Sequence, residues 1–312
     1  MRSNLSKAIT ACLLLSGVAS TAAIAGVTNP NVEMHPTGKG WGEAVSGRVD
    51  FANKPGAARP SAGAGITLHT GGVITGTVNI YYIWYGNWNS TTQGILTNFG
   101  SSIGGSPYFG INKTYFDHSN VHVSGAVSYA GFTNDAYSQG PASTSLSDAQ
   151  ILNVVNAAIT SGRLPKDTNA VYFVLTSSDV HKSGFGTSYC GWHSNASIGG
   201  SDIKYSFVGD PSVQYPANCG QQATGPNGSS GADAMASIIA HELEEATTDP
   251  DLNAWYDSRG AENGDKCAWT FGSTYTAPNG SLANVKLGTR DYLIQQNWNY
   301  NSTVSLQRCA MQ

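Results

Sequence analysis

The sequence predicts an α/β domain in which a mixed, twisted sheet packs against one long helix. Two β-branched and aromatic runs, 74–85 and 170–176, have the pattern of buried strands. A third stretch, 232–247, has the apolar spacing of a packed helix. Because strand and helix patterns alternate along the chain, the simplest arrangement is one sheet with helices against it.

The first run alternates at its start and ends at Gly86-Asn87, which favours a long strand that is partly buried on both faces. Residues 90–103 follow with apolar side chains at helical spacing, which predicts a helix. A loop-rich, strand-like stretch is predicted over 111–130.

The second helix is predicted to begin after Ser147, because Ser147 and Gln150 match a capping box. Its apolar stripe ends before Gly162. The continuous apolar run over 170–176 is typical of a central strand, and 203–208 predicts another strand.

Two Gly- and Asn-rich stretches, 183–201 and 210–229, are predicted to be long loops. Ser230 and Asp233 then resemble a second capping signal for the helix over 232–247. Pro250 ends that helix, since proline cannot continue the hydrogen-bond ladder.

The N-terminus is typical of an exported protein. Residues 1–25 combine a basic start, a short apolar run and a small-residue motif, which predicts a signal peptide and a secreted or periplasmic protein. Residues 26–70 are rich in Gly, Ala and Pro and are interpreted as a flexible lead-in or pro-segment. A single domain is expected over 71–312, and no apolar run in it reaches the length of a membrane span.

Charge excludes one class of partner. The chain has 20 acidic and 16 basic residues, and no lysine or arginine cluster that could neutralise phosphates, so nucleic acid is not expected as a partner.

Four cysteines remain after the signal peptide, and an even number in an exported chain predicts two disulfides. Three pairings are open on sequence alone. Proximity favours Cys190 with Cys219 and Cys267 with Cys309, which would pin the long loops.

The 232–247 helix carries the candidate chemistry. Residues four apart lie on one helix face, so His241 and Glu245 can reach one point in space, with Glu242 beside them. This is the geometry of the His-Glu-x-x-His zinc helix, with Glu245 in place of the second histidine. The chain has few charges yet crowds carboxylates after position 241, and a bound cation would relieve their repulsion.

Further ligands must come from outside the helix. Glu262 and Asp265 are the preferred pair, because Cys267 would hold their loop rigid; Asp251 is the alternative, and Asp249 is expected to be a helix-end residue. Zinc is the expected ion, with calcium as the alternative because carboxylates also suit it.

His193 is also a candidate ligand, but a loop histidine that is hydrogen-bonded to the backbone is the favoured interpretation.

Several segments resemble the EXORDIUM, or phosphate-induced protein, family, and the resemblance covers most of 70–312. They are 76–86, 174–180, the Cys190-Gly191-Trp192-His193 motif and the 231–250 helix. The plant members are extracellular proteins linked to growth signalling, and they lack the His-Glu pair on this helix. The 241–250 stretch with 262–267 is similar to relatives of the zincin metallopeptidase type, which implies a zincin-like fold with Glu242 as general base.

Two functions follow as expectations. The first is a zinc-dependent, peptidase-like hydrolase that acts on a protein or peptide substrate, with His241, Glu245, Glu262 and Asp265 around the metal. The alternative is a non-catalytic secreted protein of the EXORDIUM type, with a structural metal, that interacts with the cell surface or with cell-wall polysaccharide.

Overall fold

The computed structural model describes residues 65–312 of the chain. The signal peptide predicted over 1–25 and most of the lead-in predicted over 26–70 lie outside the described residues. The described end of the lead-in is packed: Ile66 is fully buried, and β1 (Thr67–Leu68) pairs with β9 (Trp255–Tyr256). Within 65–312, no helix is long and apolar enough to cross a membrane.

Five strands form the central sheet in the order β3-β2-β5-β8-β7. The first four are parallel to one another, and β7 lies antiparallel to β8 at the edge. The mixed sheet predicted from the sequence is therefore confirmed. The strands are β2 (Val78–Tyr85), β3 (Val127–Asp135), β5 (Ala170–Thr176), β7 (Gly191–Ile198) and β8 (Ser201–Gly209).

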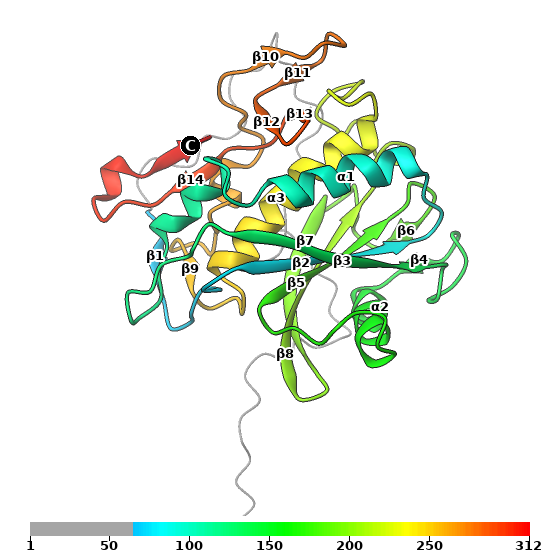
Figure 1. Cartoon of the computed structure of the whole chain (residues 1–312), viewed down its shortest axis with the longest axis horizontal. Coiled ribbons are helices and arrows are strands. Elements are labelled where there is room, and N and C mark those ends of the chain that lie inside the picture. Colours follow the sequence, from blue (N-terminus) through cyan, green and yellow to red (C-terminus); the bar gives the residue numbers. More distant parts are fainter. Residues whose placement is uncertain (1–64) are drawn as a thin grey trace, which may run out of the picture.

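Helices cover both faces of this sheet. α1 (Ser90–Ser102) and α3 (Ser230–Thr248) lie side by side over one face, and α2 (Asp148–Thr160) lies on the other (Figure 1). α3 packs against β7 and β8, so it lies over the edge of the sheet that holds the antiparallel strand. Residues 65–312 also contain three short 3₁₀ turns: η1 (Phe109–Thr114), η2 (Asp265–Cys267) and η3 (Val304–Leu306).

The helix starts follow local side-chain chemistry. The capping box of α2 is present as predicted: the Ser147 side chain accepts from the Gln150 amide, and the Gln150 side chain accepts from the Ser147 amide. α3 begins at Ser230, two residues before the predicted start at 232, because Ser229 caps it by accepting from the Ala232 amide. Asp249 ends α3, and its carboxylate accepts from the amides of the following turn, as expected.

Two strands differ from the prediction. β7 lies inside the stretch 183–201 that was predicted to be a loop, and the loop prediction is wrong there. Ser194 and Asn195 are buried and Ser197 is exposed in this strand, which pairs with β8 along its whole length. The strand-like stretch predicted over 111–130 holds η1, and its true strand, β3, starts only at Val127.

The chain after α3 forms short hairpins beside α1 and α3 (Figure 1). The Tyr292 side chain donates to the Ile95 carbonyl, which ties this region to α1. Both favoured disulfides are present, Cys190–Cys219 and Cys267–Cys309. The remaining strands are β4 (Ser145–Leu146), β6 (His181–Lys182), β10 (Tyr275–Thr276), β11 (Leu282–Ala283), β12 (Val285–Leu287), β13 (Arg290–Tyr292), β14 (Asn297–Asn299) and β15 (Arg308–Ala310).

Candidate metal centre

The face of α3 that was predicted to carry chemistry is buried inside the protein. His241 is 1% exposed, and Glu242 and Glu245 are fully buried. The His241 Nε2 atom lies 3.1 Å from Glu245 Oε1, which is the one-turn contact expected for residues four apart on a helix. The structure therefore brings these three side chains together, at the point where α3 packs on β7.

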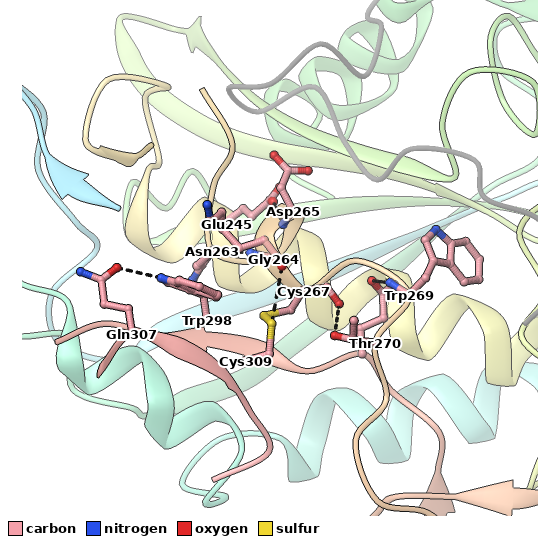
Figure 2. The surroundings of a disulfide bond; sticks show 12 residues. Glu245, Asn263, Gly264, Asp265, Cys267, Trp269, Thr270, Trp298, Gln307 and Cys309 are labelled. Carbon is pink, nitrogen blue, oxygen red and sulfur yellow. Dashed lines mark hydrogen bonds between the residues drawn. A yellow bond between two sulfur atoms is a disulfide. The ribbon is translucent and has the colours of Figure 1, made fainter. Parts of the chain in front are cut away.

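The loop before η2 closes over this helix face. The Asp265 amide donates to Glu245 Oε1 at 3.0 Å, and the Glu262 amide donates to Asp265 Oδ2 at 3.1 Å. Asp265 Oδ1 lies 3.8 Å from His241 Nε2, so this carboxylate also faces the helix. Figure 2 shows Asp265 and Glu245 next to each other, with Gly264 and Asn263 beside them.

A glycine makes this close approach possible. A Cβ atom at Gly264 would lie 3.0 Å from both the His241 ring and Glu245 Oε1, which is closer than a side chain normally packs. The disulfide Cys267–Cys309 then fixes the end of the loop (Figure 2). The expectation that a disulfide pins the loop carrying Glu262 and Asp265 agrees with this arrangement.

His193 joins the centre from strand β7. Its Nε2 atom lies 3.3 Å from Glu262 Oε2 and 3.8 Å from Glu245 Oε2, and the side chain is fully buried on β7. The interpretation of His193 as a loop histidine bonded to the backbone is therefore wrong. Gly191 lets β7 approach α3, since a Cβ there would lie 3.0 Å from Glu242 Oε1. In the sequence, the Cys190-Gly191-Trp192-His193 motif was the feature that could have pointed to His193 as part of the centre.

The candidate ligand atoms form two overlapping groups. His241, Glu242 and Glu245 make one, and His193, Glu245 and Glu262 make the other; within each, the atoms lie within 4.8 Å of one another. Asp251, the alternative ligand, lies elsewhere: its carboxylate is 3.4 Å from the Lys204 ammonium. The preferred pair, Glu262 and Asp265, is thus the pair that reaches the helix.

Burial controls the protonation of the centre. It lowers the pKa of His193 to about 4. The charge of Glu245 acts to raise this pKa, and the charge of His241 lowers it further. His193 is therefore neutral at physiological pH and keeps a lone pair for a cation. Burial alone would raise the pKa of Glu245, but His241, His193 and the Asp265 amide together hold it below its usual value.

Glu244, the next residue on the helix, behaves differently. Burial raises its pKa well above the usual range, so this carboxyl keeps its proton, and it belongs to neither ligand group. The helix thus carries adjacent glutamates with opposite pKa shifts, one suited to a metal and one not.

The conserved region of phosphate-induced protein 1 matches residues 66–303 of this chain. The chain belongs to this family. Protein EXORDIUM-like 3 of Arabidopsis thaliana is 31% identical over 274 residues, which cover 75% of this chain and 80% of that protein. Protein EXORDIUM-like 5 of the same plant is 32% identical over 277 residues, with 76% of each chain covered. No solved structure matches this chain.

Membership of the EXORDIUM family agrees with the resemblance inferred from the sequence. The match includes β7, α3 and the loop of Glu262 and Asp265, so the candidate metal centre lies inside the matched residues.

Proposed function

We propose that this chain is a non-catalytic, extracellular protein of the EXORDIUM type whose fold is completed by a buried metal centre. One observation carries the proposal: His193, His241, Glu245 and Glu262 come from three separate segments and are at most 1% exposed. Structural metal sites are closed by protein ligands, whereas catalytic sites keep an open position for water or substrate. A closed set of buried ligands supports a structural role.

The chemistry of the ligands favours zinc. Two imidazoles and at least two carboxylates fit the nitrogen and oxygen ligands of zinc, while calcium prefers oxygen ligands alone. His193 and His241 would supply the nitrogens, and Glu245 and Glu262 the oxygens. Such a metal would join β7, α3 and the loop before η2, and would contribute directly to folding free energy.

The sequence features that are typical of export support an extracellular site of action. The predicted signal peptide and two disulfides fit an oxidising compartment, where disulfides persist. Within this proposal, the partner is a cell-surface component such as a wall polysaccharide, which rests on the family resemblance.

The test is elemental analysis of the purified, exported protein by mass spectrometry. We expect at least one zinc per chain, and a lower zinc content in His241→Ala. Glu244→Gln is the matched control, because it alters a buried glutamate of the same helix that lies outside both ligand groups. Protein that was never exposed to chelator and contains no metal would overturn the proposal.

A second candidate, a zinc-dependent peptidase-like hydrolase, is favoured by the position of Glu242. This carboxylate lies in one ligand group with His241 and Glu245, which is where a general base would be placed. The antiparallel edge strand β7 packs on the same helix. Zinc bound there would acidify a water molecule. Glu242 would accept its proton. Peptide hydrolysis that is lost in Glu242→Gln with the metal retained would favour this function over the structural role.

A further inference from the structure

We infer that the centre holds two divalent cations, with the Glu245 carboxylate bridging them. This inference rests on the proposed metal centre and adds the number of ions. His241 and Glu242 would bind one ion, and His193 and Glu262 the other.

The two oxygens of Glu245 point to different histidines. Oε1 lies 3.1 Å from His241 Nε2, and Oε2 lies 3.8 Å from His193 Nε2. A carboxylate that serves one ion presents one oxygen, or both oxygens, to a single position. Here each oxygen has its own nitrogen partner, which is the arrangement of a bridging carboxylate.

The ligand atoms also divide into two groups rather than one. Each group is compact, with ligand atoms within 4.8 Å, and the two groups share only Glu245. Ligands of a single zinc ion lie about 2.0–2.2 Å from it, so any two of them are within about 4.4 Å of each other. Two ions on either side of one carboxylate account for two compact groups with one shared member, and ions in such sites are about 3.5–4 Å apart.

The hydrogen bonding of Glu245 is a further indication of a second cation. Its Oε1 atom accepts the Asp265 amide, but Oε2 receives no hydrogen bond within the described residues, although the side chain is fully buried. A buried oxygen without a hydrogen bond destabilises the fold, and more so when it is charged. Oε2 faces the His193 group, so a second cation there would supply the missing interaction.

Charge agrees with two ions. Four carboxylates converge at the centre and carry four negative charges when ionised, and two divalent cations carry the same positive charge. The four are Glu242, Glu245, Glu262 and Asp265. Lys266, which follows this loop, pairs with Asp257, whose carboxylate lies 2.8 Å from the lysine ammonium.

The experiment is a metal titration of the full exported protein. Apo-protein is titrated with Co²⁺ while visible absorption and electron paramagnetic resonance are recorded. We expect two equivalents to bind and the resonance signal to weaken at the second equivalent, because a shared carboxylate couples the two spins. A single equivalent with an uncoupled signal would overturn the two-ion inference and leave the proposed metal centre intact.

Variants separate the two positions without relying on activity. Glu262→Gln and His241→Ala are each expected to bind one equivalent of Co²⁺ with an uncoupled signal, and Glu245→Gln to bind little or none. Glu244→Gln, the matched control, should bind two. If Glu262→Gln and His241→Ala each lose all metal, the centre has one ion. Wild-type protein that binds no Co²⁺ would overturn the metal centre itself.

Discussion

The protein buries carboxylates in two different ways. Asp148 and Asp257 are each paired with a lysine, with Lys182 at 2.7 Å and Lys266 at 2.8 Å. Glu245, which is equally buried, faces two histidines and, among the described residues, no lysine or arginine. In the first case the chain supplies the positive charge itself.

The difference indicates where a cation from solution is needed. An unpaired buried charge is strongly destabilising, so a fold retains it only when something else neutralises it. The lysine-paired carboxylates should therefore be insensitive to metal, whereas the centre on α3 should depend on it. Four predictions test this contrast, from the largest expected effect to the smallest.

Metal removal should have the largest effect. Chelation of wild-type protein should lower the free energy of unfolding by about 4 kcal/mol or more, the gain expected from a ligand present at about a thousandfold excess over its Kd. Urea unfolding with and without chelator measures the difference, and added zinc should reverse it. Equal stability in both conditions would contradict the contrast.

Lys182→Met should cost about 3–5 kcal/mol, because it leaves Asp148 as a buried charge without its lysine. Unlike chelation, this loss should not respond to added zinc, and the metal content should stay unchanged. The double variant with Asp148→Asn is the control and should recover part of the loss. Urea unfolding with parallel metal analysis checks both points, and a loss of metal in Lys182→Met would show that the two regions are coupled.

Asp233 shows a third way to bury a carboxylate, mainly through hydrogen bonds, with a smaller effect of the Arg290 charge. The Asn227 amide and side chain donate to it, and burial raises its pKa to about 6. Since the pKa in the folded state exceeds that in the unfolded state, the stability that this group contributes is complete below about pH 4 and is lost as pH rises through 6.

Asp233→Asn should remove this pH dependence. Relative to wild type, the variant should gain about 1–3 kcal/mol between pH 4 and pH 7, since one unit of pKa corresponds to about 1.4 kcal/mol. Urea unfolding at intervals across that pH range gives the difference in free energy of unfolding. Parallel plots of stability against pH for the two proteins would contradict the raised pKa of Asp233.

Asp202→Asn should have the smallest effect. The Asp202 side chain is 49% exposed and lies 2.6 Å from the Lys204 ammonium, and exposed ion pairs contribute about 1 kcal/mol at most. We expect a change below that value and full metal content. A larger loss of stability in thermal unfolding would mean that the exposure of an ion pair does not predict its contribution to the stability of this fold.

The sequence predicted those parts of the fold that depend on local pattern. The stripe of α2, the run of β5 and the proline after α3 each act within a few residues, and the structure agrees with them. The spacing of His241 and Glu245 also fixed their common face, because helix geometry is regular.

The rest depends on contacts between distant segments. β7 has the composition of a loop, and only its pairing with β8 makes it a strand, so the direction of His193 could not be read from its neighbours. Glu262 and Asp265 were chosen through the nearby cysteine, but their approach to α3 depends on Gly264, whose role appears only in three dimensions.

The two disulfides lie next to the segments that complete the candidate metal centre. Cys190 precedes the histidine of β7, and Cys267 follows the acidic loop, so each crosslink holds one of the segments that complete the centre on α3. Thiols stay reduced in the cytosol, where neither segment would be held. In the extracellular protein that we propose, the centre would close only after export, and its metal would come from the supply outside the cell rather than from the cytosolic pool.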